Sequence, residues 1–202
     1  MNRRPIHARN LSCQGYLRDD QLWEFEATLH DSKAHAFNTI ERGRLPPETP
    51  IHDLTLRVCL DDELYIKEIE ATMEAAPFQL CRQVPERLKQ LCGIQIGKDW
   101  LKKVSLVIRR EENCTHLTEL LRMIANTAFQ TIFPYKVRDA DSPKIMNASI
   151  INQCQGFSAQ GEIIQSYFPE IVQSHTVKKT DNEEGSCQSN ENNPKATVKD
   201  SK

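Results

Sequence analysis

The chain of 202 residues is long enough for one domain with a core of its own, and 39% hydrophobic residues supply the apolar mass that such a core needs. A net charge of −2 gives the chain no overall field that would attract nucleic acid or an anionic membrane, and no apolar run approaches the roughly 20 residues of a membrane span. The N-terminus lacks the apolar segment of a secretory signal and the seven cysteines form no CxxC pair, so we expect a cytoplasmic protein with reduced thiols.

The first predicted elements are two strands, at residues 11–17 and 22–29, on either side of a polar turn. In the second strand, Trp23, Phe25 and Ala27 alternate with polar residues. This period of two predicts one buried and one solvated face.

Residues 32–50 contain three prolines and are expected to form a connecting loop. A hairpin is expected next, with strands at residues 54–60 and 65–73 and an acidic turn between them. Antiparallel pairing across this turn brings His52 close to residues 74–81.

Three helices are expected after the hairpin, at residues 79–91, 98–110 and 113–129, because apolar residues recur there at helical spacing. A short strand at residues 149–154 and a short helix at residues 162–167 are expected beyond them.

The predicted fold class is therefore α+β, with an antiparallel sheet of about four strands packed by three main helices. Residues 1–172 are expected to form this single domain. Residues 173–202 offer almost no apolar side chains to offset the entropy of ordering, so we expect a disordered polar tail there.

The most suggestive chemistry lies at Cys114 and His116, at the start of the third predicted helix. A thiol in the first turn of a helix meets free N–H groups and the positive end of the helix dipole, which favour the thiolate. Side chains at these two positions can face one cavity, either as half of a metal site or as a Cys–His nucleophile pair. The structural alternative is a buried cysteine beside a capping histidine.

His52 and Cys81 are further candidates. An imidazole can bind a metal through one nitrogen while a carboxylate, here Asp53, orients the other. Cys81 lies near the opening turn of the first predicted helix. The structural alternatives are a strand-end histidine packed under the proline loop and a cysteine that acts as a small apolar filler, and Cys154 has the same alternative.

Several segments form a distinctive set: residues 13–20, 22–26, 52–54, 56–57, 76–78, Cys81, 114–117, 154–156 and 167–169. Together they resemble a bacterial family, the domain of unknown function 2889. The resemblance covers roughly residues 4–170, implies no established activity, and hints at a context of aromatic or lipid breakdown.

The order of hairpin, loop and helices is also similar to iron–sulfur scaffold proteins, so the resemblance implies a NifU/SufE-like fold. In the scaffolds, cysteine and histidine ligands converge at one end of the sheet. Carried over by position, this resemblance implies a metal site formed by His52, Cys81, Cys114 and His116. Such a His/Cys set suits one zinc or iron ion.

Three functions remain open from the sequence. The first is a protein that binds a single transition metal, extending to a small metalloenzyme of aromatic or lipid catabolism. The second is a metal-free enzyme or sulfur carrier with Cys114 as nucleophile and His116 or His52 as base. The third is a non-catalytic module that binds a small molecule or a protein. In each case we expect neither nucleic acid nor membrane as a partner.

Overall fold

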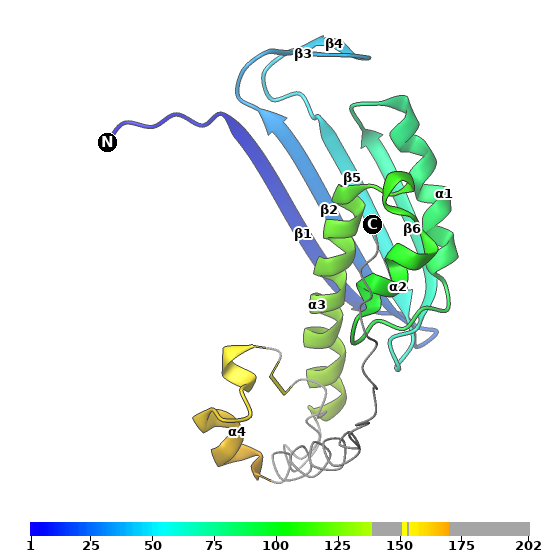
Figure 1. Ribbon diagram of the computed structural model, residues 1–202, viewed down its shortest axis with the longest axis vertical. Coiled ribbons are helices and arrows are strands. Elements are labelled where there is room, and N and C mark those ends of the chain that lie inside the picture. Colours follow the sequence, from blue (N-terminus) through cyan, green and yellow to red (C-terminus); the bar gives the residue numbers. More distant parts are fainter. Residues whose placement is uncertain (139–150, 153, 170–202) are drawn as a thin grey trace, which may run out of the picture. The chain divides into compact units, whose positions relative to one another are not determined.

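The computed structural model describes residues 1–138, 151–152 and 154–169 (Figure 1). The chain divides into two compact units, Met1–Asp139 and Ala140–Lys202. The strands of the first unit are β1 (His7–Leu17), β2 (Trp23–Lys33), β3 (Phe37–Thr39), β4 (Gly43–Leu45), β5 (His52–Leu60) and β6 (Ile66–Ala75). Its helices are η1 (Gln79–Gln83), α1 (Val84–Leu88), η2 (Lys89–Leu91), α2 (Trp100–Val107), η3 (Arg110–Glu112) and α3 (Thr115–Val137).

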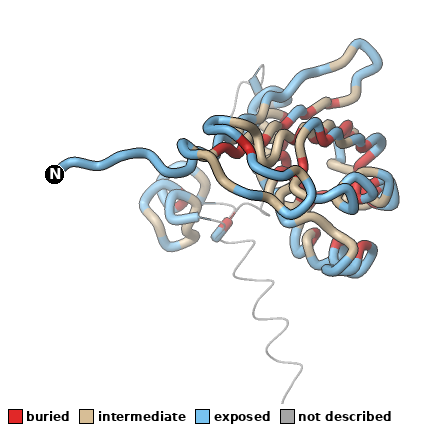
Figure 2. Tube along the Cα trace, turned by 90° about the horizontal axis from the view of Figure 1, so that it is seen from above, coloured by how far each residue is buried: buried red, intermediate tan, exposed pale blue. Residues whose placement is uncertain are grey.

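Four strands form one antiparallel sheet in the order β1-β2-β5-β6, and the helices cover one of its faces (Figure 1). Alternate residues of β2 and β5, such as Phe25, Leu29 and Leu56, are fully buried on the covered face. Buried residues follow the strands and the sides of the helices that face them, while the loops are exposed (Figure 2). The predicted α+β class with a four-stranded antiparallel sheet and three main helices is confirmed.

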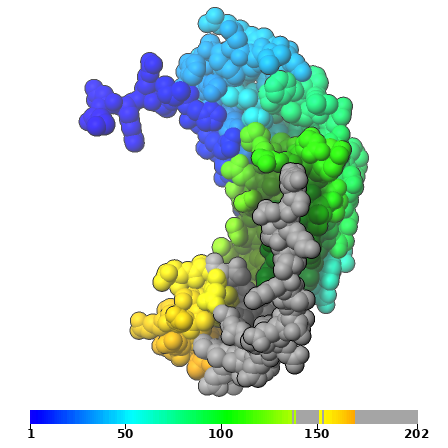
Figure 3. Space-filling model, in the orientation of Figure 1, coloured from blue at the N-terminus to red at the C-terminus, as the bar shows by residue number. Residues whose placement is uncertain are grey.

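The long helix α3 packs along the sheet through a stripe of buried residues, which includes Leu117, Leu120 and Ile124. The approach is closest at Gly15 of β1, where an added Cβ would lie 2.7 Å from the Phe25 ring and 3.1 Å from Thr131 Oγ1 of α3. Residues 1–6, before β1, are exposed and project from this unit (Figure 3).

Two predicted segments differ from the structure. The helix expected at residues 79–91 is divided into η1, α1 and η2. Pro85 lies in the first turn of α1, because a proline has no N–H to continue the preceding turn but fits the start of a new one. The loop expected at residues 32–50 contains the short antiparallel pair β3 and β4, whose turn is held by the Thr39 side chain.

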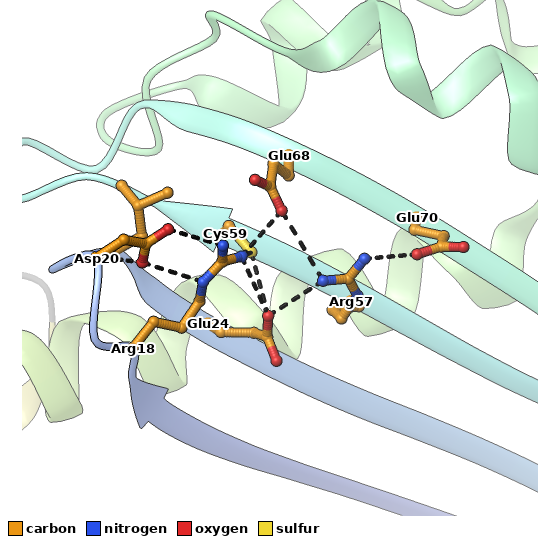
Figure 4. A network of polar contacts seen from close by, with 8 residues as sticks. Arg18, Asp20, Glu24, Arg57, Cys59, Glu68 and Glu70 are labelled. Atoms are coloured by element: carbon orange, nitrogen blue, oxygen red, sulfur yellow. Dashed lines mark hydrogen bonds and ion pairs between the residues drawn. The ribbon is translucent and has the colours of Figure 1, made fainter.

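The solvated face of the sheet carries a network of ion pairs (Figure 4). Arg18 contacts Glu68 at 2.9 Å, and Arg57 contacts Glu24 at 3.1 Å. Cys59 is completely buried beneath these side chains, and burial together with the neighbouring carboxylates raises the pKa of its thiol to about 12. This thiol is therefore protonated at neutral pH and unreactive.

The described part of the second unit contains η5 (Gln155–Phe157) and α4 (Glu162–Tyr167), with Ile151 and Ile164 buried against each other. The predicted short helix is confirmed by α4. Of the strand expected at residues 149–154, residues 149, 150 and 153 lie outside the described residues and residues 151–152 form a turn. The predicted tail also lies outside the described residues. No helix in the described part of the chain is long and apolar enough to cross a membrane.

Candidate metal centre

A row of polar residues crosses the covered face of the sheet where β2 ends and β5 begins. Arg9 of β1 lies opposite Asp31 of β2, and Asp31 lies opposite His52 of β5. Asp31 continues the buried stripe of Trp23, Phe25, Ala27 and Leu29, so its side chain points toward the helices. It is 1% exposed, and a carboxylate so deeply buried needs partners that compensate for the loss of water.

Those partners are basic side chains on neighbouring strands. Arg9 donates two hydrogen bonds to Asp31, from Nε to Oδ1 and from Nη2 to Oδ2, each 2.7 Å long. His52 Nδ1 lies 3.0 Å from Asp31 Oδ2, and His7 Nε2 lies 3.4 Å from Oδ1. This bidentate geometry is the strongest form of an ion pair between arginine and a carboxylate.

The environment fixes the charges of these groups. Burial alone would raise the pKa of Asp31, but the hydrogen bonds and charge of Arg9, helped by His52, outweigh it and hold this pKa at about 2. Burial lowers the pKa of His52 below its ordinary value, and the carboxylate of Asp31 only partly opposes this effect. Asp31 is therefore ionised at pH 7 and the imidazole of His52 is neutral, with its proton on Nδ1 because an ionised carboxylate only accepts.

The first turn of α3 brings a second imidazole to the same place. Asn113 Oδ1 accepts a hydrogen bond of 2.7 Å from the backbone N–H of Cys114, and Thr118 Oγ1 donates one of 3.0 Å to the Cys114 carbonyl. Glu119, one turn further along, pairs with Arg9 at 3.1 Å and holds the helix against β1. These contacts position His116 over the end of the sheet.

The ring of His116 packs against the ring of His52, with 3.9 Å between their centroids and 38° between their planes. Its Nε2 is 3.9 Å from Asp31 Oδ2, and its Nδ1 is 3.8 Å from Cys114 Sγ. Burial lowers the pKa of His116 and the nearby His52 lowers it further, so this imidazole is also neutral at pH 7. Neutral imidazoles are the form that binds metal ions.

Asp31, His52 and His116 each offer a ligand atom, and these atoms all lie within 4.8 Å of one another. The three residues are thus a candidate group for a metal ion. Cys114 is not in this group and approaches it only through His116.

The four residues singled out in the sequence all line one pocket of 460 Å³: His52, Cys81, Cys114 and His116. His52 comes from the sheet, Cys81 from η1, and the other two from the start of α3. The antiparallel pairing that was expected to bring His52 near residues 74–81 is confirmed, since Ala76 and Cys81 line the pocket beside it. Cys81 is half-buried against the core. Among the described residues, no hydrogen bond joins Cys81 to the ring of His52 or of His116.

Sequence reasoning missed Asp31 and Arg9, because the two strands were expected to cover only residues 22–29 and 11–17. In the structure, β5 pairs with β2 as far as Asp31, and pairing between β1 and β2 extends these strands to His7 and Lys33. The available signal was an aspartate that continues an apolar stripe of period two. Asp53, expected to orient His52, instead lies 3.8 Å from His30 on the solvated face of the sheet.

Fold and site together define an α+β protein with an antiparallel sheet covered by helices on one face, where a buried carboxylate lies against two imidazoles. A family model described as protein of unknown function (DUF2889) matches residues 7–130, which include the whole candidate centre. The match covers more than half of the chain, so the chain belongs to this family. No curated protein and no solved structure matches. The likeness to iron–sulfur scaffolds therefore has no support from a known structure.

Proposed function

We propose that the chain binds a single transition-metal ion, zinc or iron, through His52, His116 and Cys114, with Asp31 behind the rings as the carboxylate that orients His52. The observation that carries the proposal is the hydrogen bond of 3.0 Å between His52 Nδ1 and Asp31 Oδ2, while His116 Nε2 lies 3.9 Å from the same oxygen, beyond hydrogen-bond distance. A carboxylate that accepts from one imidazole nitrogen leaves the other nitrogen available for a metal.

The role of Asp31 follows from its partners. Arg9 already occupies both carboxylate oxygens at 2.7 Å. A metal ion bound directly to Asp31 would lie within a few ångströms of the guanidinium charge and would have to displace or repel it. Orientation of the His52 imidazole keeps the ion pair intact and is a common use of a carboxylate behind a metal-binding histidine.

Cys114 is the third proposed ligand. A thiolate about 2.3 Å and an imidazole nitrogen about 2.0 Å from one ion lie about 3.5 Å apart in tetrahedral geometry. The distance from Cys114 Sγ to His116 Nδ1 is 3.8 Å, close to this value.

The fourth position belongs either to Cys81, which the sequence suggested, or to water or substrate in the pocket. An ion with an open position can activate a bound water or polarise a carbonyl group. The apolar pocket beside the proposed ion extends the proposal to a small metalloenzyme that acts on an apolar, aliphatic or aromatic compound.

Metal analysis of the purified chain tests the proposal. We expect about one zinc or iron ion per chain, lost in His52→Ala and His116→Ala and retained in His30→Ala, a matched histidine on the opposite face of the sheet. A folded chain with intact thiols that holds no metal after growth with added zinc and iron would refute it.

Two further variants assign the roles. With cobalt as the probe, Cys114→Ser should abolish the near-ultraviolet charge-transfer band of a thiolate ligand. Asp31→Asn should weaken metal binding about 10- to 100-fold. Complete loss of the metal in Asp31→Asn, with an unchanged spectrum in Cys114→Ser, would instead make Asp31 the ligand.

A second function is favoured by one observation, the line that runs from Cys114 Sγ through the two nitrogens of His116 to Asp31, with gaps of 3.8 and 3.9 Å. This is the order of a nucleophile, a base and an orienting carboxylate. It predicts rapid alkylation of Cys114 near neutral pH in the metal-free chain, slowed in His116→Ala. Labelling at the rate of an ordinary thiol would exclude this function.

A further inference from the structure

The pocket beside the candidate metal centre has a floor and two walls from different parts of the chain. Leu54 and Met73, a paired couple on β5 and β6, form its floor. η1 and α1 supply one wall, and η3 with the start of α3 supplies the other. Arg87 ties the walls together, because its Nη1 donates a hydrogen bond of 3.1 Å to the carbonyl of Glu112.

The lining is apolar over most of its extent and remains open at the rim. Val84 of α1 is buried in it, whereas Phe78 is 41% and Leu80 is 70% exposed. Large apolar side chains rarely stay exposed around a cavity without a ligand or partner to cover them. The volume of 460 Å³ lies within the range of about 300–1,000 Å³ that small-molecule sites occupy.

Three charged side chains line the pocket: Arg87, Glu111 and Glu112. Both glutamates lie against Arg109, at 3.4 and 3.0 Å, so the charges of the two arginines and the two glutamates balance. Arg87 is half-buried and, among the described residues, has no carboxylate within ion-pair distance. Its single hydrogen bond to a backbone carbonyl leaves most of its five N–H donors for a ligand.

We infer that this pocket binds an apolar monocarboxylate, with the carboxylate on Arg87 and an aliphatic or aromatic body over Leu54, Met73 and Val84. Arginine pairs with a carboxylate in a bidentate manner, and the apolar body replaces water on the floor and rim. The inference names the ligand class for the pocket of the proposed function. Its link to a reaction rests on that function, but the contact with Arg87 needs no metal.

Binding of straight-chain acids from butanoate to octanoate, measured by calorimetry, tests the apolar part. Affinity should rise about threefold for each added methylene group, since a buried methylene contributes about 0.8 kcal/mol and part of the chain stays at the open rim. Leu80→Ser changes only an exposed rim residue and should reduce this increment for the longest acids. A flat series, with octanoate no tighter than butanoate, would overturn the inference.

Hexanoate compared with hexanamide tests the carboxylate. The acid should bind at least about tenfold more tightly in the unaltered chain, as charge-assisted hydrogen bonds imply. Arg87→Met should abolish this preference and keep the methylene increment. Arg122 is an exposed arginine of α3 away from the pocket, so Arg122→Met should change neither the preference for the acid nor the methylene increment. Equal binding of acid and amide, or an Arg87→Met variant that still prefers the acid, would refute the role of Arg87.

Each titration is repeated on the chain after chelation of metal, with the metal content measured in parallel. Acid binding by a chain that never holds metal would sustain the pocket ligand and refute the proposed metal function. A chain that binds one metal ion but shows no preference for apolar acids would sustain the proposed metal function and refute the pocket ligand. Circular dichroism of each variant establishes that the fold is intact.

Discussion

Replacement of Asp31 by asparagine tests the physical account of the centre at the level of stability. The asparagine side chain has nearly the same shape as that of aspartate but no charge, and it presents an N–H₂ group to donors of Arg9 and His52. The perturbation therefore removes the ion pair and leaves the Arg9 guanidinium without its closest anion. Breaking the pair in this way is destabilising because Arg9 loses its bidentate partner and keeps only the more exposed Glu119.

The magnitude follows from the pKa of Asp31. A change from 3.8 in the unfolded chain to about 2 in the folded chain corresponds to about 2 kcal/mol of folding free energy. Because the pKa is lower in the folded state, this stabilisation is fully present above pH 3.8 and is lost as the pH falls through about 2. With the added cost of opposed donors, we expect Asp31→Asn to lose about 2 to 4 kcal/mol at pH 7.

Urea unfolding of both proteins between pH 7 and pH 2 measures this effect. The unaltered chain should lose about 2 kcal/mol more than the variant on acidification, so the two stabilities converge toward pH 2. Asp19→Asn, an exposed turn residue, is the control and should stay within about 0.5 kcal/mol of the unaltered chain. Parallel pH curves for the unaltered chain and Asp31→Asn would refute the reasoning.

The remaining predictions concern the sheet and its core. Cys59, with a pKa of about 12, should react with iodoacetamide at pH 8 only as fast as the chain unfolds; rapid labelling in native conditions, followed by mass spectrometry, would contradict its burial. Gly15→Ala should cost about 1 to 3 kcal/mol in urea unfolding, because its Cβ would lie 2.7 Å from the ring of Phe25; an unchanged midpoint would show that the ring moves freely. Leu120→Ala, in the fully buried stripe of α3, should cost about 2 to 5 kcal/mol, and a loss below about 1 kcal/mol would place α3 only loosely on the sheet.

Element boundaries were the main difference between the predicted and the observed fold. The period of two in β2 and the helical stripe of α3 were readable because each local pattern reflects one buried face. The division of the first predicted helix could not be read from the sequence. Val84 and Leu88 fit a helical spacing that continues through η1 and η2, although the backbone of these two segments is 3₁₀. Spacing of apolar residues does not distinguish these two helix types over a few residues.

Some residues of the candidate site could likewise be predicted from the sequence, and others could not. His52, Cys81, Cys114 and His116 stood out as chemically able residues, and the hairpin turn already implied that the first two segments meet. Asp31 did not stand out, because its significance depends on Arg9 and His52 lying opposite it in register. Register between strands far apart in the chain is set by the packing of the whole sheet.

The sequence by itself determined the class of fold, the alternation that buries one face of the sheet, and the side chains capable of binding a metal, because each depends on residue type and local period. Only the tertiary structure decided that β1, β2 and β5 align an arginine, an aspartate and a histidine in one row, and that the first turn of α3 closes the row with a second histidine. Ionisation of a carboxylate that is 1% exposed depends on these partners from distant parts of the chain, whose approach requires the folded core.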